Sequence, residues 1–522
     1  MLINIYCAKC TGIQAEPVTV EVDISNGIGI HLVGLADVAV KESLLRIMTA
    51  LQALGYRIPG RKIVINLAPA DVRKNGSGYD LPIAVGIIAA SGQRDIPHPD
   101  RFIIMGELGL DGSVRPVPGA ISIAEFAGQA GFDGCILPLD SAREASELPD
   151  VNIYGVRTLA DVLTILSGDP EACIFRINGN APAVREPDMS GQKADYMDFA
   201  DIVGQEQAKR GLEIAASGGH NVIMVGPPGS GKTSLARALT GIMPPMQKEE
   251  AILTSKIYSV AGLGGKGAGL IRQRPFRAPH YSASMAAVIG GGNGENIIPG
   301  EVSLAENGVL FLDEFALMPK SITEALRGPV EDRKVVISRL RSKVEFPASF
   351  MLVAAANPCP CGYYGVGNRC VCSPAQRQSY MTRLSGPIMD RIDIQLYMNQ
   401  ISPGELVRGR KAESSADVAA RVIAAREVQK ERFAGTGIFV NAEMNQEMMA
   451  EHCRLDSRCR DFMERLSDSL GLSARAFSRI LKIARTIADI EYSSGSSGKT
   501  GTITPEILSE AAGYRFLDKF VR

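Results

Sequence analysis

The stretch NVIMVGPPGSGKTSLARAL, residues 221–239, decides the fold that this sequence predicts. An apolar run, Val222–Val225, leads into the pattern Gly-x-x-x-x-Gly-Lys-Thr, and residues suited to a helix follow it. A buried strand, a glycine-rich turn and a helix in this order predict a phosphate-binding loop, because the glycines let backbone N–H groups close around phosphate oxygens. Every position of the motif is filled, which disfavours a simple glycine-rich turn.

The motif also assigns roles to side chains. We expect Lys232 to reach the β- and γ-phosphates of ATP and Thr233 to ligate Mg²⁺. The other positions expected to bind the nucleotide are Gly226, Pro227, Pro228, Gly229, Ser230, Gly231 and Ser234.

Two further apolar runs end in polar residues suited to the same chemistry. In GVLFLDE, residues 308–314, Asp313 is predicted to hold the Mg²⁺ shell and Glu314 to orient and polarise the attacking water. In SFMLVAAANP, residues 349–358, Asn357 is predicted to touch the γ-phosphate or that water. Adjacent acids after a strand and an Asn-Pro turn are each common alone, but downstream of a phosphate-binding loop they favour an ATP-hydrolysing site.

Composition limits the classes of protein to which the chain can belong. It has 522 residues, a formal net charge of −1 and 45% hydrophobic residues, so two to four domains with ordinary cores are expected. The charge balance argues against a uniformly basic nucleic-acid binder but allows a local basic channel. The most apolar stretch, LPIAVGIIAA, is about half as long as a membrane span, and the start lacks an export-signal pattern. We therefore expect a cytoplasmic protein whose ten cysteines are thiols or metal ligands.

The pattern along the chain predicts an α/β protein in three folded parts. Residues 1–170 alternate short β-branched runs with helical ones, and residues 171–196 form a polar linker. Residues 197–400 form a second α/β part around the phosphate-binding loop, with a cysteine-rich insertion at 359–372. Residues 401–522 are mostly helical, because apolar residues recur there at helical spacing.

Longer phrases of the sequence connect it to a known family. They are DIVGQEQAKRGLEIAASGGHNVIMVGPPGSGKT (201–233), IPGEVSLAENGVLFLDE (298–314), AAANPCPCG (354–362) and LSGPIMDRIDI (384–394). These phrases, SARAFSRILKIARTIADIE and most of the first part resemble the magnesium-chelatase-like AAA+ ATPases, specifically the ComM/YifB family. The resemblance implies a P-loop AAA+ core with a C-terminal helical lid, and a ring that is typically a hexamer. It also implies that Arg391 is the arginine finger entering the neighbouring subunit's site and that Arg475 is the second sensor; spacing alone would leave both arginines solvated.

The resemblance further implies a function on DNA. An ATP-driven branch-migration helicase, acting when incoming single strands recombine during natural transformation, is the expectation. The expected partners are therefore single-stranded or branched DNA and further copies of the chain, without a membrane. Three alternatives stay open: a motor for Mg²⁺ insertion into a porphyrin, a Lon-like protease, and a nucleotide-switched scaffold. The complete set of hydrolytic residues argues against the scaffold.

The first part resembles the proteolytic domain of the Lon family, which has a ribosomal-S5-like fold. The resemblance lies in APADVRKNGSGYDLPIAVGIIAA (68–90) and GELGLDGSVRPVPGA (106–120). That family's Ser nucleophile and Lys base fall on Gly78 and Ile121, and Ser77 is one residue displaced. Because isoleucine cannot act as a base, we expect a domain without proteolytic activity that supports the ring or binds DNA. Its candidate basic surface comprises Lys41, Arg46, Arg57, Arg61, Lys62, Arg73 and Lys74.

A second basic feature lies between the acidic strand and Asn357. In RKVVISRLRSKVEFP, Arg339, Arg341 and Lys343 alternate, so in a hairpin we expect them to project from one face. The resemblance to AAA+ ATPases implies that a hairpin at this place points into the pore of the ring. Such cations suit a DNA phosphate backbone, although an exposed hairpin without a ligand would look the same. Further pore candidates are an insertion at 290–307 and the arginines Arg272, Arg274 and Arg277.

Four cysteines follow Asn357 in two Cys-x-Cys pairs, Cys359 with Cys361 and Cys370 with Cys372. Four thiolates are the number that a closed tetrahedral zinc site needs, although each pair is one residue tighter than the usual knuckle. A regulatory disulfide and spare thiols are the alternatives. A zinc ion or disulfide that links these cysteines would stiffen the loop. It would also present Tyr363, Tyr364 and Arg369 for contact. The lone pair Cys7 and Cys10 is expected to be structural or without a role.

Overall fold

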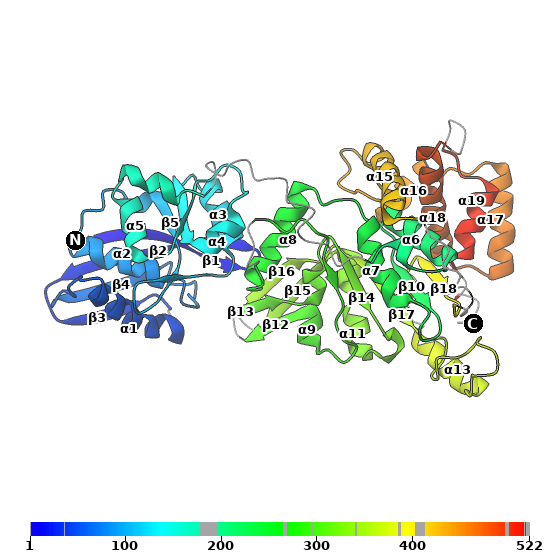
Figure 1. The fold of residues 1–522 in the computed structure, drawn as a ribbon, viewed down its shortest axis with the longest axis horizontal. Coiled ribbons are helices and arrows are strands. Elements are labelled where there is room, and N and C mark those ends of the chain that lie inside the picture. Colours follow the sequence, from blue (N-terminus) through cyan, green and yellow to red (C-terminus); the bar gives the residue numbers. More distant parts are fainter. Residues whose placement is uncertain are drawn as a thin grey trace.

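The computed structural model describes residues 2–35, 37–177, 197–264, 269–293, 296–339, 342–384, 388–401, 404, 413–495, 501–515 and 517. The N-terminal part lies at one end of an elongated molecule and the C-terminal helices at the other (Figure 1). The predicted α/β class is confirmed. The predicted boundaries at 170, 197 and 400 stay predictions, because 178–196 and 405–412 lie outside the described residues.

The N-terminal part is built on a seven-stranded sheet with the order β3-β4-β2-β1-β5-β8-β9. β1 pairs antiparallel with β2 and β2 antiparallel with β4, while the remaining neighbours are parallel. Alternation along β2 buries Val18, Val20 and Val22, because successive side chains point to opposite faces of a strand. The strands are β1 (Leu2–Thr11), β2 (Gln14–Ser25), β3 (Gly29–Val33), β4 (Lys62–Ala68), β5 (Phe102–Ile104), β8 (Gly134–Pro138) and β9 (Ile153–Val156).

Helices cover this sheet, and a small antiparallel pair, β6 (Glu107–Leu108) with β7 (Val114–Arg115), lies outside it. The run Asp80–Ile88 of one helix is buried throughout, which explains why its sequence is apolar without a helical period. The helices are α1 (Val38–Ala53), α2 (Asp80–Ala90), α3 (Ala120–Gln129), α4 (Leu139–Ala145) and α5 (Leu159–Leu166).

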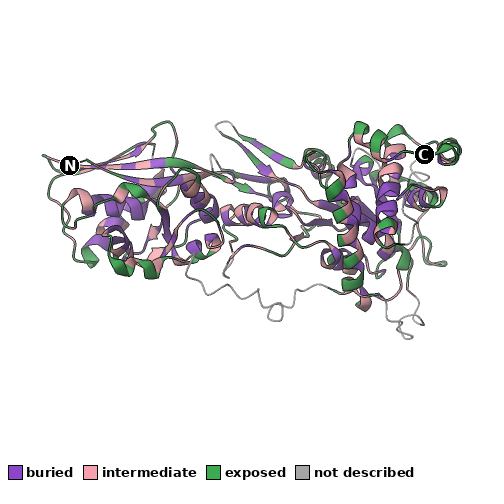
Figure 2. Ribbon diagram, turned by 90° about the horizontal axis from the view of Figure 1, so that it is seen from above, coloured by how far each residue is buried: buried purple, intermediate pink, exposed green. Residues whose placement is uncertain are grey.

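The central part contains a five-stranded, fully parallel sheet with the order β11-β14-β17-β10-β18. Its inner strands are buried on both faces, as their continuous apolar runs require. In Figure 2 the buried residues concentrate in the strands and in the helix faces that pack on them. The strands are β11 (Phe276–Arg277), β14 (Val309–Leu312), β17 (Met351–Ala356), β10 (Val222–Val225) and β18 (Ile394–Tyr397).

Helices pack on both faces of the central sheet. Val222 and Met224 face one core, which also holds residues of α6 and α7, whereas Ile223 and Val225 face a second core. Two antiparallel hairpins project beside this sheet: β12 (Gly290–Asn293) with β13 (Asn296–Pro299), and β15 (Lys334–Arg339) with β16 (Ser342–Pro347). The helices are α6 (Glu206–Gly218), α7 (Lys232–Ile242), α8 (Lys248–Val260), α9 (Met285–Ile289), α10 (Glu301–Leu304), α11 (Lys320–Ala325), α12 (Arg327–Asp332) and α13 (Pro374–Met381).

The C-terminal part is made of helices, and we call it the lid, as the resemblance predicts. In sequence, Ser414, Asn445, Asp456, Ser473 and Thr504 cap its helices, each accepting a backbone N–H of the first turn. Two of the helices, α15 and α18, pack on α6 of the central part, so the lid and the sheet share one core. The helices are α15 (Ser415–Arg432), α16 (Gln446–His452), α17 (Ser457–Leu470), α18 (Ala474–Ser493) and α19 (Pro505–Gly513).

The N-terminal part contacts the central part at α8 with the segment that follows it, and at the tip of the β1–β2 hairpin. At the first, the Gly119 N–H donates to the Ser259 carbonyl over 3.1 Å, and the Ser259 hydroxyl donates to Glu144 over 2.9 Å. At the second, the tip of the β1–β2 hairpin lies on β16: a Cβ atom on Gly12 would be 2.8 Å from Val344 Cγ1. Only glycine allows this approach, since its φ of +62° is also unfavourable for other residues.

Candidate functional site

The predicted phosphate-binding loop joins the carboxyl end of β10 to the first turn of α7. Gly229 and Gly231 have φ angles of 75° and 89°, a region that favours glycine, which explains the glycines at these two positions. The loop residues Gly226, Pro227, Pro228, Gly229, Ser230 and Gly231 precede the helix, and Lys232, Thr233 and Ser234 form its first turn. Backbone N–H groups at the start of a helix are unpaired within it, so this turn can receive an anion.

The predicted side chains gather at this end of the sheet. Lys232 Nζ donates to the Gly226 carbonyl over 2.7 Å and lies 3.3 Å from Asn357 Oδ1. Thr233 Oγ1 lies 3.3 Å from Asp313 Oδ2. Burial lowers the pKa of Lys232, opposed by the Asp313 carboxylate. The adjacent hydroxyl and carboxylate oxygens are ligands that Mg²⁺ prefers, so the residues present fit a magnesium ion.

Glu314 has an unusual backbone conformation at the end of β14. Its φ of 49° lies in the left-handed region, and its N–H donates to Asp313 Oδ1 over 2.9 Å. Non-glycine residues adopt this region at a cost, and such residues cluster at functional sites. The conformation turns the chain after Asp313, at the carboxyl end of β14.

Arg391 and Arg475 lie at the opposite edge of the sheet. Arg391 comes three residues before β18, and its carbonyl accepts from Asn221, which directly precedes β10. Arg391 and Asn221 therefore lie at the amino ends of two parallel strands, whereas the phosphate-binding loop follows the carboxyl end of β10. Arg475 Nη1 lies 3.0 Å from Asp390 Oδ2, which places the two arginines together. A strand of four residues spans about 13 Å, so neither arginine faces the loop of its own chain.

A cleft of about 760 Å³ opens at this amino edge between the sheet and the lid. Its lining includes Glu331, Arg391, Arg475, Arg479 and Lys482. Arg391 is buried and bonds to the exposed carboxylate of Glu331. Cations outnumber acids in this lining, and Arg391, Arg475 and Arg479 are each paired with an acid of the same chain.

The four clustered cysteines come together. The Sγ atoms of Cys359, Cys361, Cys370 and Cys372 all lie within 4.8 Å of one another, and three of the pairs are separated by 3.3, 3.8 and 3.7 Å. Four sulfurs at about 2.3 Å from a central zinc would be about 3.8 Å apart. The cluster can therefore hold a metal ion. The pKa of Cys361 is lowered to about 6, because the N–H of Tyr363 points at its sulfur, while burial raises the pKa of Cys359 to about 12.

The cysteine loop contacts the phosphate-binding loop. A Cβ on Gly362 would lie 2.9 Å from Pro228 Cδ, so the two loops touch. Beyond this contact, the Arg377 guanidinium lies 4.5 Å from the ring centre of Tyr364, which is exposed. The predicted presentation of Tyr364 at the surface is therefore seen. Arg369 is also exposed, and Tyr363 is half-buried.

Comparison with known proteins decides the family. Residues 198–406 match the model described as magnesium chelatase, subunit ChlI; 20–141 match subunit ChlI of Mg-chelatase; and 412–515 match its C-terminal region. The chain is 42% identical over 524 residues to the competence protein ComM of Haemophilus influenzae, covering 100% of this chain and 99% of that protein. The chain belongs to the ComM/YifB family of magnesium-chelatase-like AAA+ proteins.

Two further proteins, both from Escherichia coli, are similar to this chain. It is 42% identical over 519 residues to the uncharacterized protein YifB of Escherichia coli, which covers 99% of this chain and 97% of that protein. A shorter match, 29% identical over 112 residues, relates 21% of the chain to 23% of the DNA repair protein RadA of Escherichia coli. None of the helices in the described part of the chain has both the length and the apolarity that crossing a membrane requires.

The basic hairpin of this ComM/YifB chain differs from the prediction. Arg339 pairs with Ser342 and Lys343 with Ser338 across the strands. Arg339 shares the face of the buried Ile337, whereas Lys343 shares the opposite, exposed face. The prediction that three cations project from one face is wrong, because in this register Lys343 faces Ser338, the neighbour of Arg339, and so points to the other side of the hairpin. Arg339 and Lys343 are both exposed, while Arg341 lies outside the described residues.

The other predicted pore arginines form ion pairs within the chain. Arg272 pairs with Glu147 of the N-terminal part, Arg274 with Glu250 at 3.0 Å, and Arg277 with Glu301 at 2.6 Å. Arg274 also donates to the carbonyls of residues 244 and 307. Each of these arginines holds two segments of the chain together, and their role as pore contacts stays a prediction. The 290–307 insertion, expected as a loop, forms the β12–β13 hairpin and α10.

The basic surface of the N-terminal part is smaller than predicted. Lys74 is fully buried and donates to the Pro69 carbonyl, and Arg46 pairs with the buried Asp80 at 3.0 Å. Of the predicted cations, Arg57, Arg61 and Arg73 are exposed and Lys62 is half-buried, while the side chain of Lys41 is outside the described part.

The positions of a Lon-type dyad are filled by apolar packing. A Cβ on Gly78 would lie 2.9 Å from Met105 Cε and 3.3 Å from Val117 Cγ1, so a serine there would require these side chains to move. Ile121 is 2% exposed and belongs to the core of the N-terminal part. The hydroxyl of Ser77 bonds to Glu107 instead. In this chain, therefore, neither a nucleophile nor a base stands at these two positions.

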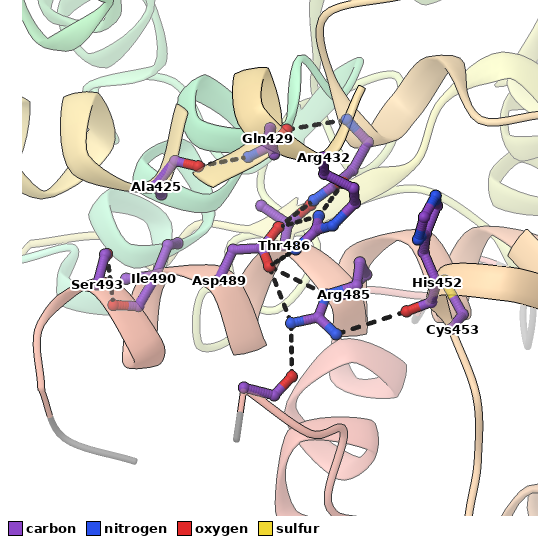
Figure 3. Close-up of polar contacts among 12 residues, drawn as sticks. Ala425, Gln429, Arg432, His452, Cys453, Arg485, Thr486, Asp489, Ile490 and Ser493 are labelled. Atoms are coloured by element: carbon purple, nitrogen blue, oxygen red, sulfur yellow. Dashed lines mark hydrogen bonds and ion pairs between the residues drawn. The ribbon is translucent and has the colours of Figure 1, made fainter. Parts of the chain in front are cut away.

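A buried polar network, missed by sequence analysis, fixes the lid. Figure 3 shows Asp489, which is fully buried, between Arg432 and Arg485; Asn441 donates to the same carboxylate over 2.8 Å. The neighbouring Thr486 hydroxyl continues the network to His220 and Asp393 at the amino edge of the sheet. Only the charge at a mostly apolar helix position could have indicated this carboxylate. The network ties α18, and with it Arg475, to the sheet.

We expect Asp489→Ala to destabilise the lid by about 3–5 kcal/mol, because two arginines would be left buried without their carboxylate. The midpoint of chemical unfolding, followed by circular dichroism, should fall. Glu427→Gln, which removes an exposed pair with Lys430 on α15, should change the midpoint little. Equal midpoints for the two variants would show that the network does not stabilise the lid.

Proposed function

We propose that the chain is an ATP-hydrolysing subunit of a ring-shaped motor. One observation supports this most: the loop, Lys232, Thr233, Asp313 and Asn357 gather at one edge of the sheet. In this proposal the loop N–H groups and Lys232 bind the phosphates, and Thr233 and Asp313 hold Mg²⁺. The bound Mg²⁺ neutralises charge on the β- and γ-phosphates.

The remaining roles belong to residues that act on the γ-phosphate. Glu314 orients and polarises the attacking water, and Asn357 contacts that water or the γ-phosphate. Arg391 and Arg475 both lie at the amino edge and meet a γ-phosphate only when a second copy presents its loop to that edge. The proposed site is therefore shared between neighbouring subunits, with both arginines acting in trans. A closed ring satisfies this head-to-tail contact for every copy, and we propose a hexamer as in related AAA+ proteins.

The proposed substrate of the motor is DNA. The relatives are named a competence protein and a DNA repair protein, which supports a role in transformation and recombination. The exposed cations of the β15–β16 hairpin supply a contact for a phosphate backbone. We propose ATP-driven migration of branched DNA as the activity, in the cytoplasm, where thiols stay reduced.

The proposal is tested by ATP-dependent unwinding of a labelled three-strand DNA junction. Unwinding that needs hydrolysable ATP is expected. The family name also allows a chelatase motor, so Mg²⁺ insertion into a porphyrin should be assayed in parallel, as should casein cleavage. Porphyrin metallation without unwinding would replace the DNA motor by the chelatase motor, and casein cleavage would contradict the apolar packing at Gly78 and Ile121.

We propose that the cysteine cluster binds zinc, and we expect about one zinc per purified chain. Replacing Cys370 and Cys372 by Ser should abolish it, because hydroxyls are poor zinc ligands. Since the loop touches Pro228, DNA-stimulated hydrolysis should fall more than basal hydrolysis. Elemental analysis of protein prepared without chelator measures the metal, and Cys173→Ser, at an exposed cysteine, is the matched control. If the protein were metal-free and all four thiols reacted freely with a thiol reagent, the zinc proposal would be wrong and the cysteines would be spare thiols.

We expect Arg339→Ala/Arg341→Ala/Lys343→Ala to weaken DNA binding and to lower its salt dependence, because fewer counterions are released. Each lost phosphate contact reduces the slope of log K against log salt by about 0.7–0.9. Fluorescence anisotropy over a salt series measures the slope. Lys334→Ala in the same hairpin, whose lysine is paired with Glu345 at 3.2 Å, should change the slope less. An unchanged slope in the triple variant would remove the hairpin from the DNA path.

A further inference from the structure

Glu331 occupies a special position in the amino-edge cleft. It lies in the last turn of α12, with a side chain that is 57% exposed, and its carboxylate bonds to Arg391, whose side chain is 7% exposed. Arg475, paired with Asp390, lines the same cleft. Arg391 and Arg475 lower the pKa of Glu331, the hydrogen bond from Arg391 being the largest cause. Each arginine that is proposed to meet a neighbour's phosphate is thus bound to an acid of its own chain.

The contact has a consequence for ring assembly. The γ-phosphate and the Glu331 carboxylate are both anions that accept hydrogen bonds from the Arg391 guanidinium. Arg391 can therefore give all its hydrogen bonds to a γ-phosphate only if its bond to Glu331 breaks. In a subunit without a neighbour, the carboxylate keeps the guanidinium folded in the cleft. In an assembled pair, the phosphate and the carboxylate compete.

We propose that Glu331 positions Arg391 by competition: its carboxylate holds the finger inside the cleft and releases it to the γ-phosphate of a nucleotide-loaded neighbouring subunit. This inference rests on the proposed function, because it requires Arg391 to act in trans. Glu331 touches no reacting atom and works only through Arg391.

Glu331 lies close in sequence to the basic β15–β16 hairpin. Two residues after it, Arg333 ends α12 with a φ of 53°, and β15 of the basic hairpin begins at Lys334. Arg333 bonds to Ser349 and Glu443, which keeps the base of the hairpin against the lid. A change of partner at Arg391 therefore occurs at the base of the hairpin that carries Arg339 and Lys343.

The test is Glu331→Gln, which removes the charge while keeping the shape. Specific ATPase activity is measured against protein concentration. We expect half-maximal activity at a protein concentration roughly five-fold lower than in the wild type. A factor of about five corresponds to the free energy of a partly exposed ion pair. The rate at saturating protein concentration should not fall. Asp332→Asn, at the adjacent exposed acid, is the matched control and should resemble the wild type. Glu331→Asp, which keeps the charge, should restore most of the wild-type concentration dependence.

A second measurement separates competition from a merely structural role. ATP-dependent assembly is followed by light scattering in four proteins. They are the wild type, Glu331→Gln, Arg391→Ala and the double variant that carries both changes. The effect of Glu331→Gln should vanish in the Arg391→Ala background, because the carboxylate acts through that arginine. An effect that persists there, an unchanged concentration dependence, or a higher half-maximal concentration would each overturn the inference. Normal hydrolysis by Arg391→Ala would instead overturn the proposed site shared in trans.

Discussion

Arg391→Ala should reduce the ATPase rate by about 10³–10⁵ while leaving nucleotide binding intact, the range seen when an arginine finger is lost. The two effects separate because Arg391 lies at the amino ends of the strands, away from the Lys232 and Thr233 of its own chain. Steady-state hydrolysis at saturating ATP measures the first effect. Equilibrium binding of a fluorescent ATP analogue measures the second.

A matched control is available on α17. Arg465 is exposed and bonds only to the carbonyl of residue 461 within the described part of the chain, so Arg465→Ala should hydrolyse ATP at the wild-type rate. If Arg391→Ala turned over within a factor of about ten of the wild type, the finger assignment would have to be abandoned.

Glu314→Gln should bind ATP and hydrolyse it about 10²–10⁴ times more slowly, the usual contribution of a positioned acid–base group. The amide is isosteric and cannot polarise the water, while the contacts of Lys232 with the loop are unchanged. With ATP bound and not hydrolysed, rings should persist, which size-exclusion chromatography with ATP detects. Glu324→Gln, at an exposed acid on α11, is the control. Near-normal turnover in Glu314→Gln would reject Glu314 as the residue that activates water.

The sequence predicted those parts of the site that are built from local signals. The loop, Lys232 and Thr233 lie in one motif, and Asp313 and Asn357 each follow an apolar strand. Because parallel strands end at one edge of a sheet, the convergence of these residues could be expected from the sequence alone. The four cysteines were also predictable as a group, since their spacing is short enough to close within one loop.

Other features depend on contacts between distant segments. The Arg272–Glu147 pair joins residues 125 positions apart, and nothing around Arg272 indicates that its charge is used within the chain. Arg339 and Lys343 fall on opposite faces because of the register in which the two strands pair, which counting alternate residues along the sequence does not give. The placement of Arg475 beside Asp390 likewise follows from the docking of the lid, which the helical pattern of α18 does not specify.

The central claim, a nucleotide site completed by two subunits, is tested most directly by mixing two inactive variants. Arg391→Ala retains the loop and Lys232, and Lys232→Ala retains Arg391. In random mixed rings at equal proportions, roughly one quarter of the interfaces combine an intact loop with an intact finger from the next subunit. We predict that ATPase activity reappears on mixing and is greatest near equal proportions. Mixed rings that form but recover no activity at any ratio would contradict the shared site.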